Sequence, residues 1–337
     1  MNWQNIADGL VLGLHIPDGF LSAPVALIWW VLTIGALALA VQRVGVELNE
    51  RQVPLMGVMA AFIFAGQMLN FPVLGGTSGH LLGGALAALL LGPWAGVLVM
   101  SAVVTLQALL FQDGGLLAIG ANVFNMGVAT VAIGYLLGMP LLRTFGGKRW
   151  GLMLIGFITA WLSVMAAALL TSLQLVFSGL SATVVFPAMI FVHAFIGIGE
   201  GLITVAALAF VVSTRPDLVS SLAGFLNKEA LQQPVDKRTI GLVTFVGLGF
   251  AALAALLSPL ASGDPDGLER VAENQGFLER AMDAPYTIIP DYTVPFLGET
   301  PLSTIAAGMI GLLILFALMY GLALVLRGRS SDSRTRS

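Results

Sequence analysis

Long apolar runs alternate with short polar or glycine-rich connections along this chain, and the pattern predicts a bundle of membrane-spanning helices. A helix needs about 20 mostly apolar residues to cross a bilayer. About nine runs in the 337 residues fit this requirement. The run at 80–92 is short, and we expect it to form a tight hairpin with the next run at Gly92-Pro93. The predicted spans cover residues 24–43, 53–70, 80–92, 93–111, 118–142, 151–177, 185–212, 240–260 and 302–326.

Composition supports the same fold class. Hydrophobic residues make up 58% of the chain, charged residues make up 10%, and the mean hydropathy is +0.94. No soluble domain has this balance, so we predict an all-α, polytopic integral membrane protein whose surroundings are the lipid bilayer. A nucleic-acid partner is not expected. Cysteine is absent, so a bound metal ion would have to use nitrogen and oxygen donors.

The basic residues orient the predicted bundle. If the N-terminus is outside, thirteen of the fifteen Lys and Arg residues fall on the inner side. The exceptions are Arg270 and Arg280, in a long loop where eight acids outnumber them. Basic residues favour the cytoplasmic side of a membrane. We therefore predict an N-out, C-in protein of the inner (plasma) membrane.

A polar stretch with two prolines at 213–239 predicts a cytoplasmic linker between two membrane units. The acidic loop 261–301 has a net charge of −6 from two bases and eight acids; it either attracts cations or is simply solvated. The predicted organisation is an extension at 1–13, a seven-span unit at 14–212, the linker, a two-span unit at 240–326 and a basic tail at 327–337.

The three histidines are the candidate chemistry. They are His15 in LHIPDGF, His80 in GGTSGHLLGG and His193 in HAFIGIGEGLIT. Imidazole binds late first-row metals, and histidine is costly to bury in lipid without a partner. The topology puts His15 and His80 on one outer face, with His193 near the outer end of the seventh span. This arrangement predicts a metal site at the outer face.

Each motif also has a purely structural interpretation. LHIPDGF reads equally as an interfacial turn with a solvated histidine, although Pro17 and Gly19 favour a fixed loop. The glycines around His80 indicate either a re-entrant turn that packs closely or a loop that presents His80, and we favour the second.

Two further pairs of polar residues lie within predicted spans. Asn122 and Asn125 share a helix face, which favours interhelical hydrogen bonding over support of a metal ligand. His193 and Glu200 lie two turns apart on one face, as a supporting pair of either functional or structural kind. Neither HExxH nor a P-loop motif occurs in the chain, so we predict that it is not an enzyme and does not itself hydrolyse ATP.

HIPDGFLSAPV, SGHLLGG, NVFNMG and HAFIGIGEGLIT, in this order, resemble the landmark stretches of the CbiM/NikM family. Members of this family are substrate-binding components of energy-coupling-factor importers for cobalt and nickel. The segments GDPDGLERVAENQGF, DYTVP and LSTIAAGMIG, from residue 263 onward, resemble the PDGLE domain, which stands in for the small two-span CbiN/NikN subunit. The resemblance implies a fusion of both components.

The resemblance also implies a ligand set made only of nitrogen. In the family, the donors are the α-amine of the initiator Met, the amide and imidazole nitrogens of the next His, and the His of SGHLLGG. Carried over, His15 and His80 supply imidazoles, and Leu14 supplies an amine only if the chain starts there. Three explanations stand: the start is misassigned, the extension is trimmed, or the site differs.

The expected function is therefore Ni²⁺ or Co²⁺ import, without a cofactor, powered by separate ATPase subunits through a membrane coupling (T) subunit. The nitrogen donors do not distinguish nickel from cobalt. The alternative is a secondary, proton-coupled metal permease, which a buried Glu200 favours. A membrane enzyme with a His/Glu metal site is a further rival, against which the missing nucleophile and three-ligand motif count.

Overall fold

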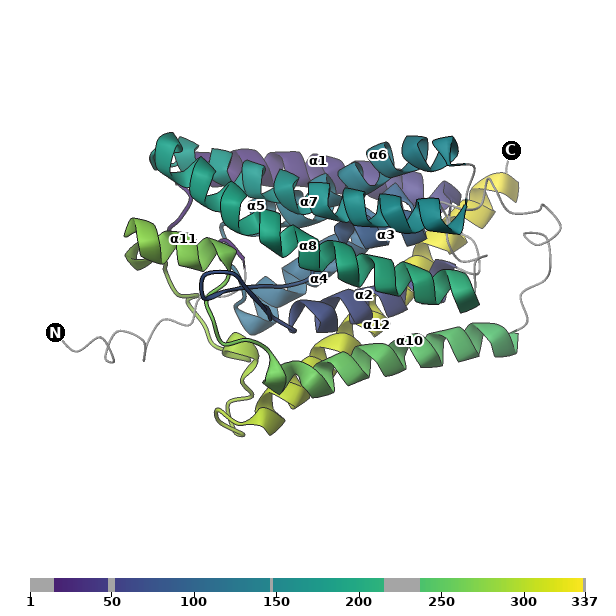
Figure 1. Ribbon diagram of the computed structural model, residues 1–337. Coiled ribbons are helices and arrows are strands. Elements are labelled where there is room, and N and C mark those ends of the chain that lie inside the picture. The colour runs from purple at the N-terminus through teal and green to yellow at the C-terminus, as the bar shows by residue number, and fades with distance from the viewer. Residues whose placement is uncertain (1–14, 48–51, 146–147, 215–236, 336–337) are drawn as a thin grey trace.

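The long helices lie roughly side by side in one bundle, and irregular segments gather at one of its ends (Figure 1). The computed structural model describes all residues except 1–14, 48–51, 146–147, 215–236 and 336–337. The α-helices are α1 (Ala23–Glu47), α2 (Gln52–Gln67), α3 (Gly84–Leu91), α4 (Pro93–Leu106), α5 (Ile119–Val123), α6 (Thr130–Thr144), α7 (Arg149–Phe177), α8 (Ala182–Thr214), α10 (Lys237–Leu257), α11 (Gly267–Gln275) and α12 (Pro301–Thr335).

Among the described residues, seven helical segments are long and apolar enough to cross a membrane. This confirms the predicted all-α membrane fold. The predicted span 80–92 is wrong in detail, because α3 has only 8 residues and rises about 12 Å. Residues 80–83 of this run are not helical, and Gly83 adopts a left-handed conformation with φ 85°. The predicted span 53–70 is likewise a 16-residue helix that ends at Gln67.

Three departures from regular helix shape the end that carries the candidate residues. Strands β1 (Phe71–Val73) and β2 (Thr77–Gly79) form an antiparallel hairpin, with Pro72 opposite Ser78. Short π-helical turns, η2 (Gln107–Phe111) and η3 (Phe124–Ala129), follow α4 and α5. Non-helical backbone inside a membrane protein needs partners from the protein itself. These segments therefore depend on the side chains that surround them.

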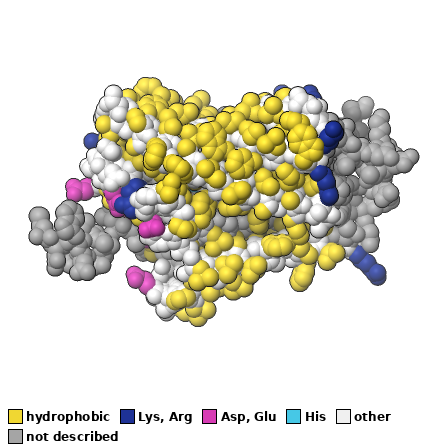
Figure 2. All heavy atoms as spheres, in the orientation of Figure 1, with side chains coloured by type: hydrophobic (Ala, Val, Ile, Leu, Met, Phe, Trp, Pro, Cys, Tyr) yellow, Lys and Arg dark blue, Asp and Glu magenta, His cyan; other side chains and the backbone are white. Residues whose placement is uncertain are grey.

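The surface between the two ends of the bundle is apolar (Figure 2). Large side chains such as Leu136 and Phe245 are 66% and 76% exposed, as expected for residues that face lipid. Most of the Lys and Arg side chains in this view lie at one end, and the Asp and Glu side chains lie at the other, beside some basic ones. We call the acidic end, which carries His15, His80 and α11, the site end, and the opposite one the basic end.

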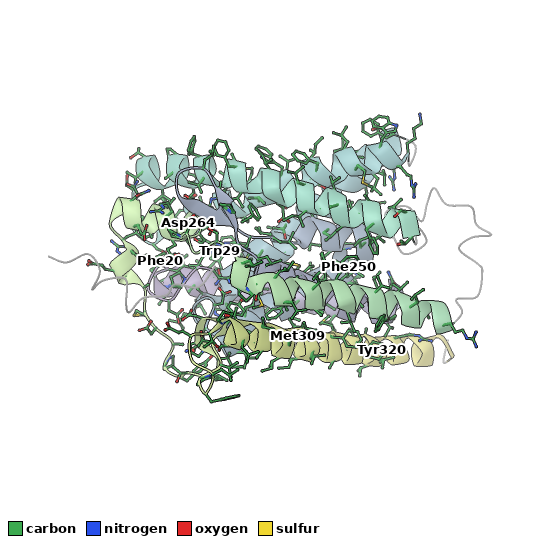
Figure 3. All side chains as sticks on the ribbon, turned by 60° about the horizontal axis from the view of Figure 1, so that its bottom comes forward. Phe20, Trp29, Phe250, Asp264, Met309 and Tyr320 are labelled. Carbon is green, nitrogen blue, oxygen red and sulfur yellow. The ribbon has the colours of Figure 1, made fainter. Side chains whose placement is uncertain are left out.

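Helices α10 and α12 lie beside each other along the bundle, with Phe250 on one and Met309 and Tyr320 on the other (Figure 3). Both pack against α2 at glycines. A Cβ on Gly247 would lie 2.3 Å from Val58, and a Cβ on Gly311 would lie 2.2 Å from Phe64. The C-terminal pair of helices is therefore seated directly on the core of the preceding bundle.

Substitution at this contact tests the packing. Gly311→Ala should destabilise the protein by about 1–3 kcal/mol, because the added methyl group overpacks the Phe64 contact. Gly321→Ala is the matched control on the same helix, since a Cβ there meets nothing within 4 Å. Thermal unfolding in detergent should show a lower Tm for Gly311→Ala only. Equal Tm values for the two variants would contradict the close contact.

Candidate metal-binding site

His15 is buried and held by Asp113 at the site end. Its Nδ1 lies 2.6 Å from Asp113 Oδ1, while its Nε2 is buried without a hydrogen-bond partner. Asp113 follows η2 in a tight turn where Gln112 and Gly114 both have positive φ angles. A Cβ on Gly114 would come within 2.9 Å of the His15 Cβ, so glycine permits the close approach of this turn.

The loop that follows His15 is fixed at two points. Asn122 accepts a hydrogen bond from the Ile16 N–H and donates one to the Ile16 carbonyl, both at 3.0 Å. The Asp18 carboxylate accepts bonds from the N–H groups of Leu116, Leu117 and Ala118, just before α5. Carboxylates are stabilised by the free N–H groups at the start of a helix. Residues 15–20 (HIPDGF) therefore form a fixed loop rather than a solvated turn.

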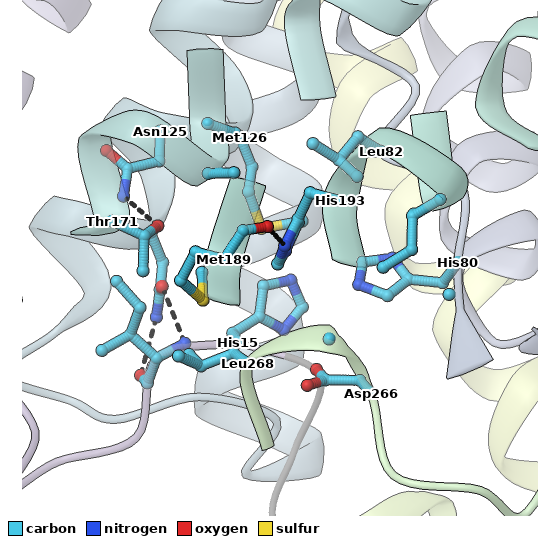
Figure 4. Close-up of a pocket in the computed structure, with 17 residues that line it drawn as sticks. His15, His80, Leu82, Asn125, Met126, Thr171, Met189, His193, Asp266 and Leu268 are labelled. Carbon is cyan, nitrogen blue, oxygen red and sulfur yellow. Dashed lines mark hydrogen bonds between the residues drawn. The ribbon is translucent and has the colours of Figure 1, made fainter. Parts of the chain in front are cut away.

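His80 stands next to His15, with ring centroids 6.0 Å apart (Figure 4). It follows β2, and its Nδ1 lies 3.0 Å from the Leu81 carbonyl. That loop is held by Glu200, which accepts hydrogen bonds from the N–H groups of Leu82 at 2.6 Å and Gly83 at 2.9 Å. Glu200 thus lies behind the loop that presents His80.

The other predicted residues divide between the pocket and its support. His15, His80, Asn122, Asn125 and His193 all line one pocket. Asn125 also hydrogen-bonds Thr171 and Gln174 on α7, the interhelical bonding that we expected. His193 contacts the Met189 carbonyl through Nδ1 at 2.7 Å. His193 and Glu200 therefore bind different partners, because two helical turns separate them by about 10 Å.

The segment at the start of α11 closes the same pocket, which the sequence did not predict. Asp266, Gly267 and Leu268 line it opposite the histidines. Asp266 caps α11 by accepting from the Glu269 N–H at 2.7 Å. Ser78 donates from its N–H to the Pro265 carbonyl, which ties β2 to this segment. The sequence signal for this segment was an acidic residue followed by glycine in the PDGLE motif. No sequence pattern indicates that the segment contacts histidines so far away along the chain.

The electrostatics of the pocket favour a neutral His80 imidazole with a free lone pair. Burial lowers the pKa of His80, and the neighbouring His15 lowers it further. A carbonyl only accepts hydrogen bonds, so His80 Nδ1 carries the hydrogen and Nε2 keeps its lone pair. Burial alone would raise the pKa of Asp113, but the charge and hydrogen bond of His15 outweigh it and the pKa is lowered. Asp113 is therefore an anionic acceptor beside His15.

A metal ion bound in this pocket would have the imidazoles of His15 and His80 as its main candidate ligands. No group of three His, Asp or Glu side chains is close enough to hold an ion within the described part of the chain. Metal–imidazole bonds are about 2.0–2.1 Å long, so an ion between His15 and His80 is compatible with their centroid separation. Leu14 lies outside the described residues.

Glu200 offers a test of the loop that carries His80. Glu200→Ala should destabilise the protein by about 1–3 kcal/mol, because two buried N–H groups lose their acceptor. Thr204→Val is the matched control one turn along α8, since the Thr204 hydroxyl is buried without a hydrogen-bond partner. The Tm in detergent should fall only for Glu200→Ala; a wild-type Tm for that variant would sink the assigned role.

Comparison with known families and proteins finds two families that match successive parts of the chain. The family described as the cobalt uptake substrate-specific transmembrane region, CbiM, matches residues 15–218. The PDGLE domain matches residues 241–328. A crystal structure of a transition metal transporter superposes with a TM-score of 0.54 at 30% identity, covering 65% of this chain and 100% of that one.

Two of the relatives match nearly the whole chain, and a third matches about the length of the CbiM segment. A protein of Archaeoglobus fulgidus, provisionally named a fused nickel transport protein NikMN, is 35% identical over 92% of this chain and 98% of its own length. The fused nickel transport protein NikMN of Rhodobacter capsulatus is 29% identical over 90% of this chain and 95% of its own. The cobalt transport protein CbiM of Sorangium cellulosum is 35% identical over 62% of this chain and 96% of its own. The chain belongs to the CbiM family of nickel and cobalt transport components, and it carries a PDGLE domain at its C-terminal side.

Proposed function

We propose that this protein is the substrate-binding membrane component of an ATP-driven energy-coupling-factor importer for Ni²⁺ or Co²⁺. The observation that carries the proposal is the pair His15 and His80, whose rings meet in a buried pocket at the site end. His15 Nε2 is buried there without a partner. A buried imidazole nitrogen without a hydrogen-bond partner is a candidate metal ligand, because a bound ion would give this polar atom the partner that it lacks.

The charges support an outward-facing pocket in the inner (plasma) membrane. Most of the basic side chains in this view lie at the basic end, which is opposite the site end (Figure 2). By the positive-inside rule, that end is cytoplasmic and the site end faces outward. An ion could then enter the pocket from outside without first crossing the bilayer.

Nitrogen coordination is the ligand set that we propose for the ion. His15 and His80 supply imidazoles, and residue 14 adds its α-amine if the mature chain begins there. The His15 Nδ1 is bonded to Asp113, so Nε2 is the nitrogen free to bind. Chelation by the His15 amide together with Nδ1 would first require release from Asp113. Nickel and cobalt suit the same donors, and the named relatives include both kinds of transporter.

Energy for transport would come from separate ATPase subunits, linked through a membrane coupling subunit. The sequence has no P-loop, which agrees with this division. A secondary, proton-coupled permease is the alternative that the buried Glu200 favoured. The structure gives Glu200 a different task, because its carboxylate is engaged by two backbone N–H groups. These hydrogen bonds support a structural role for Glu200, so we propose the importer before the permease.

Removal of His80 tests the site. His80→Ala should abolish saturable Ni²⁺ binding by the purified full-length protein, measured by calorimetric titration in detergent, because one of two imidazoles is lost. His193→Ala is the control from the same pocket, and it should retain binding, since the His193 Nδ1 is engaged by Met189. Wild-type affinity in His80→Ala would overturn the site assignment.

The chain start can be tested directly. A protein that begins with Met in place of Leu14 should bind Ni²⁺ at least about tenfold more tightly than the full-length chain, because a free α-amine adds a donor. N-terminal sequencing of the mature protein would show whether cells produce this form. Equal affinities for the two forms would mean that the terminal amine is not a ligand here.

A further inference from the structure

A chain of hydrogen bonds links the C-terminal unit to His15. Gln107 donates from its amide nitrogen to the Tyr292 hydroxyl oxygen at 3.1 Å. The Tyr292 hydroxyl donates to Asp113 Oδ2 at 2.6 Å, and Asp113 Oδ1 lies 2.6 Å from His15 Nδ1. We call this series the His15–Asp113–Tyr292 chain. Tyr292 lies between residues 241 and 328, the segment that matches the PDGLE domain, whereas the other residues precede it.

The donors and acceptors fix the hydrogen positions along the chain. Because Gln107 donates to the Tyr292 oxygen, the hydroxyl hydrogen is free to point at Asp113. A histidine that binds a metal ion is a neutral imidazole. The carboxylate can only accept, so in that form the hydrogen of His15 resides on Nδ1. The lone pair is then on Nε2, the atom that is buried without a partner. Both the orientation and the tautomer of His15 depend on how Asp113 is held.

The backbone around Tyr292 is shaped for this contact. Asp291 and Tyr292 have φ angles of 49° and 56°, a left-handed backbone conformation that residues other than glycine rarely adopt. The Tyr292 ring stacks on Phe111, with centroids 4.7 Å apart and an interplanar angle of 17°. It also lies 6.1 Å from the Phe64 ring. Consecutive strained residues persist only where the surroundings hold them, and they cluster at functional sites.

We propose that Tyr292 is a positioning residue for the metal site: it holds Asp113, which holds the His15 ring with Nε2 facing the pocket. The proposal rests on the proposed function, because it assumes that His15 binds the ion. Partners of this kind orient metal-binding histidines, and their loss typically weakens metal affinity by about 10–100-fold. The C-terminal unit would thus set the affinity of a ligand that it does not itself supply.

Paired tyrosine variants of the full-length protein test this role. Tyr292→Phe keeps the ring that stacks on Phe111 and removes only the hydroxyl. It should raise the Kd for Ni²⁺ by about tenfold and alter the visible absorption of bound Ni²⁺. Tyr286→Phe is the matched control in the same segment, because its hydroxyl donates to the Leu109 carbonyl and not to Asp113. The control should keep the wild-type Kd and spectrum.

A double-mutant cycle separates positioning from general stability. Asp113→Asn should weaken Ni²⁺ binding, and Tyr292→Phe should add little in that background, because both act through the same hydrogen bonds. Independent effects that multiply would overturn the proposal, as would a wild-type Kd for Tyr292→Phe. If the wild-type protein does not bind Ni²⁺, or His80→Ala binds it normally, the proposed function itself fails. If only the Tyr292 results fail, the function stands and the positioning role does not.

Discussion

Buried carboxylates hold the site end together. The backbone there is not α-helical around His15, around His80 and in η2. Its N–H and C=O groups lack the partners that an α-helix provides, and neither lipid nor an apolar core can supply others. Asp18 accepts from three N–H groups, and Glu200 accepts from two. Asp113 pairs with an imidazole and a hydroxyl instead. Each of these side chains thus fixes one irregular segment, and together they allow two histidines to lie close to each other.

The site is shared between two parts of the chain that are distant in sequence. The N-terminal unit supplies the histidines, and the C-terminal unit supplies the Asp266 segment that faces them in the pocket. The same C-terminal unit is anchored on α2 by close contacts at Gly247 and Gly311. A fused chain keeps both parts together at a fixed stoichiometry. In this polypeptide, residues of both units line the same pocket.

Much of the fold was predictable, because lipid imposes a simple rule on sequence. Helices that face lipid must be long and apolar, so the predicted spans 151–177 and 302–326 correspond closely to the apolar segments Arg149–Phe177 in α7 and Pro301–Arg327 in α12. The prediction failed where a segment is surrounded by protein. Helix α3 is entirely buried, so it need not match the bilayer thickness, and its apolar run was mistaken for a span. Hydropathy indicates that a segment avoids water, but it does not show whether lipid or protein surrounds that segment.

The sequence by itself determined the membrane fold, and it pointed to His15 and His80 as candidate ligands, since rare polar residues in apolar surroundings are conspicuous. Only the tertiary structure decided what each polar residue contacts. Asp113 and Tyr292 are 179 residues apart, yet they share one hydrogen bond. Glu200 turned out to hold the His80 loop rather than to pair with His193. Hydrogen bonds act over about 3 Å, and only the folded chain determines which groups come that close.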